Sequence, residues 1–224
     1  MITSLFIKDR IAPLISGICI LLSSCTKGPQ GKKEVYANNF ESSKLTGISS
    51  GLISKFGDSN VLGRYNNGGF FLKVENLSNH DLVEISFDLF IHDSWDGNTI
   101  ADGVGGPDLW QMEVDGSKYV YATFCNKECP PQLCTPQSYP ADFPNNNHFP
   151  KSGAFRTDLP GACHLSGHIG GTTQYKIVKT IKHRNKSLTL NCRDFLKQSN
   201  SPSPICDESW SVDNISIKEI VLNN

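Results

Sequence analysis

The sequence lacks an excess of charge of either sign. Its 21 basic and 22 acidic residues leave a formal net charge of −1, and a group of lysines lies near the N-terminus, at Lys27, Lys32 and Lys33. Nucleic-acid-binding domains carry a basic patch or stripe, so this composition excludes that class and predicts no nucleic-acid partner. A long apolar run is also missing. The run from Ile11 to Leu22 is well short of the ~20 residues that a membrane-spanning helix needs.

Helical periodicity and the common catalytic motifs are absent as well. No long segment repeats apolar residues at the i, i+3, i+4 spacing of an amphipathic helix. Neither a Gly-x-Ser-x-Gly elbow nor a His-Glu-x-x-His motif is present. His164 and His168 are four residues apart, but the glycines around them favour a loop over a helix. These absences argue against a serine-hydrolase elbow and a zinc-protease helix.

The N-terminus does carry an export pattern. Lys8 and Arg10 precede the short apolar run, as in a secretory signal peptide. The run ends in Leu22, two serines and Cys25, which resembles the lipobox of bacterial lipoproteins, where the cysteine is acylated and becomes the mature N-terminus. This resemblance implies a signal peptide at 1–24, a polar tether at 25–33, a domain at 34–224 and a lipid anchor in the bacterial cell envelope. Thr26 would then favour the outer membrane of a Gram-negative organism. The open alternative is a plain signal peptide with an incidental cysteine.

The rest of the chain alternates apolar and polar residues with the period of β-strands. The clearest run has Val83, Ile85, Phe87, Leu89 and Ile91 on one face. A hairpin is predicted with its turn at Asp115–Gly116. Further strands are predicted around 35–40, 48–56, 70–74, 175–181, 188–190 and 215–217. About nine strands without helices predict an all-β fold, a two-sheet jelly-roll sandwich.

The cysteines of the exported domain predict disulfides. Eight cysteines less Cys19 and Cys25 leave an even set: Cys125, Cys129, Cys134, Cys163, Cys192 and Cys206. Such a set in an exported chain suggests three disulfides. A bond between Cys192 and Cys206 is preferred because they flank a polar loop, and the other pairings stay open. The rival interpretation is a zinc site formed by the first four, although they include no tight Cys-x-x-Cys pair.

The middle of the chain, residues 125–172, is rich in cysteine and proline and shows hardly any strand pattern. A long loop of this kind inside a domain is usually functional or disordered. Disulfides restrict the unfolded chain, so they favour order here. The sequence therefore predicts an ordered, disulfide-stapled loop surface, or else an insertion that binds no ligand.

Two short motifs lie at opposite ends of the predicted domain: Phe40-Glu41, and Asp213-Asn214 followed by alternating isoleucines. They resemble the terminal strands of galactose-binding-like jelly rolls, found in many carbohydrate-binding modules and adhesion domains. That resemblance implies that the first and last strands pair and that Glu41 and Asp213 share a structural calcium ion. Oxygen ligands of this type suit Ca²⁺. The alternative is two solvated surface acids.

The stretch SWDGNTIADGVGGPDLW, residues 94–110, is more distinctive. With QSYP and the closing Trp-x-x-Asp-Asn, it resembles uncharacterised secreted bacterial β-sandwich proteins. Its oxygen-bearing side chains predict a second calcium site, formed by Asp96, Asn98 and Asp108, with Asp93 and Asp102 nearby. Acids beside glycines also form turns. A third interpretation is a polysaccharide hydrolase that uses Asp93 and Asp96 beside Trp95.

Together these patterns predict a lipid-anchored, calcium-stabilised domain that binds a carbohydrate or another surface molecule without catalysis. Aromatic residues in loops are the expected stacking platforms. Trp95 and Tyr139 are preferred over Phe149, whereas Trp110 and Trp210 lie in strand patterns and are expected in the core. Two alternatives remain: a protein-binding adhesion or envelope component, and the hydrolase.

Overall fold

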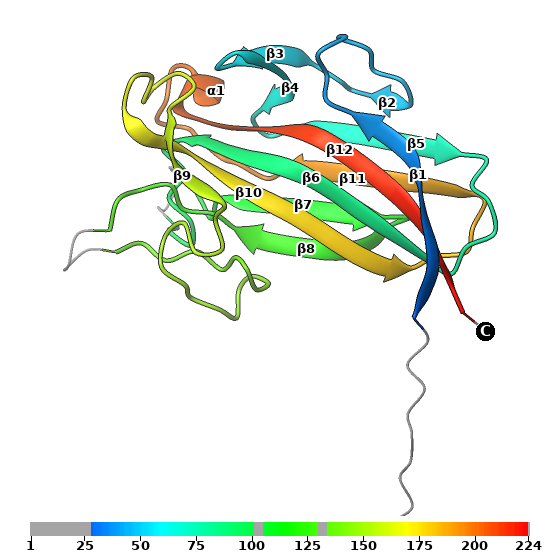
Figure 1. Cartoon of the computed structure of the whole chain (residues 1–224). Helices are drawn as coiled ribbons and strands as arrows, with labels where there is room; N and C mark the ends of the chain where they lie inside the picture. Colours follow the sequence, from blue (N-terminus) through cyan, green and yellow to red (C-terminus); the bar gives the residue numbers. More distant parts are fainter. Residues whose placement is uncertain (1–27, 101–104, 130–133, 224) are drawn as a thin grey trace, which may run out of the picture.

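The computed structural model describes residues 28–100, 105–129 and 134–223, which form two antiparallel β-sheets stacked face to face (Figure 1). The seven-stranded sheet has the order β3 (Ile53–Phe56), β4 (Ser59–Tyr65), β12 (Glu208–Leu222), β6 (Leu82–Asp93), β10 (Ile169–Lys182) and β9 (Arg156–Pro160), and β1 (Pro29–Asn38) also pairs with β12. The five-stranded sheet has the order β2 (Ile48–Ser49), β5 (Gly69–Glu75), β11 (Ser187–Asp194), β7 (Leu109–Val114) and β8 (Ser117–Thr123). One short helix, α1 (Pro204–Asp207), precedes β12.

This architecture confirms the predicted all-β two-sheet sandwich. The strand count was too low, because the described residues form twelve strands. The segment 48–56 splits into β2 and β3, and β4 and β9 were not foreseen. The predicted hairpin is present as β7 and β8, with its turn at Asp115–Gly116.

Strand β6 shows why the sequence folds this way. Its apolar positions, among them Val83, Ile85 and Leu89, are fully buried between the sheets. Its other positions face outward, and its two edges pair with β10 and β12. Each fully buried aliphatic side chain contributes ~1.5–3 kcal/mol, so the alternation fixes which face of the sheet is the core.

Aromatic side chains fill the centre of the sandwich. The Trp110 and Trp210 rings meet edge to face at 5.6 Å, which confirms that both belong to the core. Phe124 contacts Trp110 on one side and Tyr175 on the other. Edge-to-face pairs of this kind add ~0.5–1.5 kcal/mol beyond the burial of their area.

The first and last strands lie side by side. Strands β1 and β12 are antiparallel partners from Pro29↔Leu222 to Asn38↔Ile215, and Figure 1 shows them together at one edge. Residues 29–33, expected in the tether, lie in β1, where Gly31, Lys32 and Lys33 pair with β12. The predicted signal peptide and Cys25 lie outside the described residues. Within the described part, no helix has the length and apolar character to cross a membrane.

The structure corrects the predicted disulfides. The bonds are Cys129–Cys134 and Cys163–Cys206, whereas Cys125 and Cys192 are buried free thiols. The preferred Cys192–Cys206 bond is wrong, because Cys192 continues the inward-facing row of β11 and Cys206 lies in α1. The zinc interpretation also fails, since three of its four cysteines are disulfide-bonded. Two disulfides agree with an oxidising, extracytoplasmic compartment.

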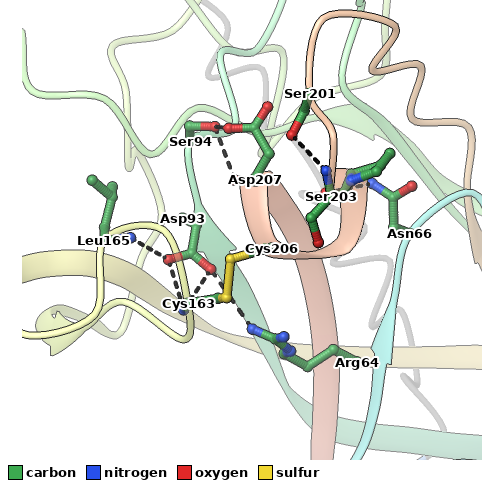
Figure 2. Close-up of a disulfide and its surroundings, with 11 residues drawn as sticks. Arg64, Asn66, Asp93, Ser94, Cys163, Leu165, Ser201, Ser203, Cys206 and Asp207 are labelled. Carbon is green, nitrogen blue, oxygen red and sulfur yellow. Dashed lines mark hydrogen bonds and ion pairs between the residues drawn. A yellow bond between two sulfur atoms is a disulfide. The ribbon is translucent and has the colours of Figure 1, made fainter.

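The disulfide Cys163–Cys206 ties α1 to the loop between β9 and β10, as Figure 2 shows. Beside it the buried Asp93 carboxylate accepts backbone N–H groups of Cys163 and Leu165. The Arg64 guanidinium lies 4.0 Å from the same carboxylate. These contacts order the loop at this end of the sandwich. His164 and His168 lie in this loop, as predicted.

The middle stretch is ordered in its described part, as expected. Between β8 and β9 the chain makes isolated bridges such as Gln137↔His148 instead of long strands. The Gln137 amide oxygen accepts backbone N–H groups of Cys125 and Lys151, at 3.1 and 2.9 Å. One buried side chain thus joins the two arms of the loop.

Candidate functional site

The outward face of the seven-stranded sheet carries two adjoining hollows. One, of about 250 Å³, is lined by Ser86, Phe87, Asp88, Lys176, Ile177, Val178 and Asn214. The other, of about 440 Å³, is lined by Ala37, Asn38, Asn39, Ser42, Asn214, Ile215 and Ser216. Because Asn214 lines both, they meet at this residue. We call the two hollows together the Asn214 groove.

A β-bulge places Asn214 on the surface. The register between β12 and β6 shifts between Asp213 and Ser216, so Asn214 is left out of the ladder. Its φ of 53° is in the left-handed region, which asparagine tolerates better than most residues. The Asn214 side-chain N–H donates to Asp88 Oδ2 at 2.9 Å, and its backbone N–H donates to Asp213 Oδ1 at 2.7 Å. The exposed amide is thereby held over β6.

The groove combines polar lining with exposed apolar surface. Amides and hydroxyls supply both hydrogen-bond donors and acceptors. Val178 in the groove is 57% exposed, and so is Phe155 just beyond Lys176. Lys176 Nζ lies 4.2 Å from the centre of the Phe155 ring, which connects this ring to the groove. Phe155 was missed from the sequence because it lies in the stretch that shows no strand pattern.

Two carboxylates, those of Asp88 and Glu41, act on the carboxyl of Asp213 at the groove. Asp213 is 8% exposed, and its burial, together with these two negative charges, raises the pKa of its carboxyl to about 6, against the lowering effect of the Asn214 backbone N–H. Glu41 Oε1 also accepts the Asn60 backbone N–H at 2.9 Å. The pairing of the terminal strands therefore does bring Glu41 and Asp213 into electrostatic contact. Nowhere in the described part of the chain do three or more His, Cys, Asp or Glu side chains form a metal-binding group.

The second predicted metal group has protein partners instead. Asp108 Oδ2 accepts the backbone N–H groups of Asp96 and Gly97. Asp96 pairs with Lys127 at 2.9 Å. The Asn98 side chain donates to Asn147 Oδ1 at 2.7 Å and accepts the Thr123 hydroxyl. The Asp108 bonds close the loop between β6 and β7, whereas the Asp96 and Asn98 bonds tie this loop to the end of β8 and to the stretch that follows it. Asp102 lies outside the described residues.

Of the two preferred stacking platforms, one is fully buried and the other is half-buried. Trp95 is completely buried, and its indole N–H donates to the Ser209 carbonyl at 2.9 Å. Its prediction as a ligand platform is wrong, because the loop after β6 turns this side chain into the core. Tyr139 is half-buried against Phe124 and Tyr175. Phe149 is 74% exposed but does not line the Asn214 groove.

Asp93 and Asp96, the carboxylates of the hydrolase interpretation, hold the fold together. Asp93 is fully buried and accepts the backbone N–H groups shown in Figure 2. The Asp96 carboxylate accepts a hydrogen bond from the Lys127 ammonium. Neither carboxylate lines one of the hollows described here.

A third hollow of about 550 Å³ lies near the turn between β7 and β8, with Tyr119, Asp81 and Arg184 in its lining. Its charges largely satisfy one another: Arg184 bonds Asp81 at 2.8 Å, and His183 contacts Asp115 at 3.1 Å. None of the exposed large hydrophobic side chains of the described residues lines it. The Asn214 groove, which places amide side chains beside the exposed Val178, is therefore the better candidate.

The sequence matches no protein-family model and no curated protein. Among solved structures it is similar to a family GH115 4-O-methyl-α-glucuronidase with specificity for decorated arabinogalactans, at 13% identity and TM-score 0.39, over 95% of this chain and 19% of that one. It is also similar to a family 22 xylan-binding domain from Paenibacillus barcinonensis, at 11% identity and TM-score 0.37, over 83% and 99%. A family 35 carbohydrate-binding module from Clostridium thermocellum matches at 9% identity and TM-score 0.34, over 76% and 88%. The chain thus spans about a fifth of the length of the glucuronidase. At identities and TM-scores this low, the similarity does not identify a ligand for this chain.

Proposed function

We propose that this domain binds a carbohydrate chain along the Asn214 groove and does not convert it. The observation that carries the proposal is the position of the Asn38, Asp88 and Asn214 side chains beside the exposed Val178 and Phe155. A sugar presents hydroxyls that both donate and accept hydrogen bonds, and it presents apolar C–H faces. Amides and carboxylates match the hydroxyls, and an aromatic ring matches the apolar face.

Binding without conversion fits the carboxylates of the groove. A glycosidase needs two carboxyl groups about 5–5.5 Å or about 6.5–9.5 Å apart on the two sides of the sugar bond. Here Asp88 accepts a hydrogen bond from Asn214, and Asp213 is buried beneath the surface. The Asp88 carboxylate is thus engaged by the Asn214 amide of the bulge, and the Asp213 carboxylate is largely withdrawn from solvent.

We further propose that a calcium ion stabilises the ends of β1 and β12, held by Glu41 and Asp213. The negative charges of Asp88 and Glu41 act on the Asp213 carboxyl, and oxygen donors of this kind suit a hard cation. Calcium would neutralise the repulsion under the groove and keep the bulge rigid. Calcium should therefore raise the unfolding temperature of the wild type and have a much smaller effect on Asp213→Ala. Equal shifts in both proteins would remove this site.

The lipid anchor remains a proposal that rests on the sequence around Cys25. It would place the domain on a membrane of the bacterial cell envelope, since several acyl chains hold a protein firmly. Metabolic labelling with a fatty acid tests it. Labelling of the wild type and none of Cys25→Ala supports the anchor, and equal labelling contradicts it.

A glycan array tests the binding function. The wild type should bind a defined set of glycans, and Asn214→Gly should lose most of the signal. Glycine keeps the positive φ while removing the amide. Asn67→Gly is the matched control, because Asn67 is also exposed with a φ of 50° but lies outside the groove. Absence of glycan binding, or equal loss in both variants, would refute the proposal, and release of shortened products would indicate a hydrolase.

A further inference from the structure

Two acidic side chains are buried at the starts of strands from opposite sheets. Asp108 directly precedes β7 and is 0% exposed, and Glu208 is the first residue of β12 and is 2% exposed. Burial raises the pKa of both carboxyls, to about 8 for Glu208, and the Glu208 charge raises the pKa of Asp108 further. Glu208 pairs with Asp93 across the β12–β6 ladder, and Asp108 accepts the Asp96 backbone N–H, so both residues lie beside the segment 93–96 at the end of β6.

Each carboxylate keeps one buried oxygen without a partner. Asp108 Oδ2 accepts two backbone N–H groups, and the Glu208 side chain bonds Gln198. Asp108 Oδ1 and Glu208 Oε2 are buried and have no hydrogen-bond partner among the described residues. Buried anionic oxygens are normally paired with a donor or a cation, because desolvating them alone costs free energy.

Among the described residues, no cationic side chain pairs with these two oxygens. Lys127 is the cation that acts on Glu208, but its ammonium is bonded to Asp96. Arg64 lies against Asp93. No ion pair of the described residues includes Asp108 or Glu208.

We propose that Asp108 Oδ1 and Glu208 Oε2 bind a divalent metal ion, with Ca²⁺ the best match to an oxygen-only site. Backbone carbonyls and water would complete the coordination, since the described chain holds no group of three or more metal-binding side chains. This pair differs from the group predicted from the sequence, because Glu208 takes the place of Asp96 and Asn98. The ion would link the start of β7 in one sheet to the start of β12 in the other.

Terbium luminescence tests the site, because Tb³⁺ substitutes for Ca²⁺ and is sensitised by nearby indoles. Trp95 is well placed: it precedes Asp96, which donates to Asp108, and its own N–H bonds the carbonyl next to Glu208. The full chain should give saturable luminescence that Ca²⁺ displaces. Asp108→Asn and Glu208→Gln should each weaken Tb³⁺ affinity by at least the ~10–100-fold that loss of an outer-sphere partner costs.

The measurements are made in an Asp213→Asn background, so that the calcium site proposed at Glu41 and Asp213 does not contribute. Glu219→Gln is the matched control, because it removes a buried carboxylate that belongs to neither site, and its Tb³⁺ luminescence should be unchanged. The proposal is overturned if the background protein gives no sensitised signal, or if Glu219→Gln weakens Tb³⁺ binding as much as Glu208→Gln does. Unfolding scans with and without a chelator provide a second readout in case Asp108→Asn does not fold. Ca²⁺ should raise the midpoint of the background protein but not that of the same protein carrying Glu208→Gln, and a background midpoint indifferent to Ca²⁺ also overturns the proposal.

Discussion

Removing the Cys163–Cys206 disulfide should cost far more stability than removing Cys129–Cys134. The first closes a loop with a sequence separation of 43 and the second one of only 5. In the chain-entropy model the loss grows with the logarithm of the loop length, which gives about 4 kcal/mol for Cys163–Cys206 and about 2 kcal/mol for Cys129–Cys134 at 25 °C. The difference arises in the unfolded chain, which the longer bridge restricts more.

The measurement is urea unfolding of two double variants, Cys163→Ser/Cys206→Ser and Cys129→Ser/Cys134→Ser, followed by tryptophan fluorescence. The first should lose about 2 kcal/mol more than the second. Hydrogen exchange in the loop 161–168 should also rise in the first variant only, because this bridge ties that loop to α1. Equal losses of stability, or a larger loss for the short bridge, would refute the reasoning.

Two further predictions concern acid and backbone strain. Burial lowers the pKa of His92 to about 3. Below about pH 6.5 the unfolded chain therefore binds more protons than the folded chain, so the free energy of unfolding decreases as the pH is lowered. His92→Gln should remove about 2 kcal/mol of the loss between pH 7 and pH 5, measured as the difference between wild-type and variant urea curves; identical pH dependence would contradict this. Gly63→Ala should destabilise more than Gly57→Ala, although both have positive φ, because only the Gly63 Cβ would lie 2.8 Å from Ser211 Cβ. Thermal unfolding should show ~1–2 kcal/mol of conformational strain for Gly57→Ala and a further ~1–3 kcal/mol of overpacking for Gly63→Ala; equal losses would contradict the clash.

The strands with clean alternation could be predicted because each has one buried face. Strand β6 was found over most of its length, since every second residue from Val83 to Ile91 is apolar. Strand β9 was missed because it is short, lies at an edge and is mostly exposed, so burial leaves no pattern in it. Cys192 could have been assigned to the core, because it continues the inward row of Leu188 and Leu190.

Side chains placed by loops could not be predicted from local pattern. Trp95 follows a strand in a polar stretch, and its burial depends on Ser209, which is far away in the sequence. The sequence motifs did suggest that Glu41 and Asp213 meet. The groove above them needs the bulge at Asn214 and the register of β6 with β10, which only the assembled sheet reveals.

The most direct test of the proposed binding is calorimetry of a glycan identified on the array, with Phe155→Ala and Phe149→Ala compared. Both phenylalanines are exposed, but only Phe155 adjoins the groove, through Lys176. If an aromatic face contributes ~0.5–1.5 kcal/mol to stacking, Phe155→Ala should weaken binding about 2- to 13-fold while Phe149→Ala leaves it unchanged. Unchanged affinity in Phe155→Ala, or equal weakening in both variants, would contradict binding in the Asn214 groove.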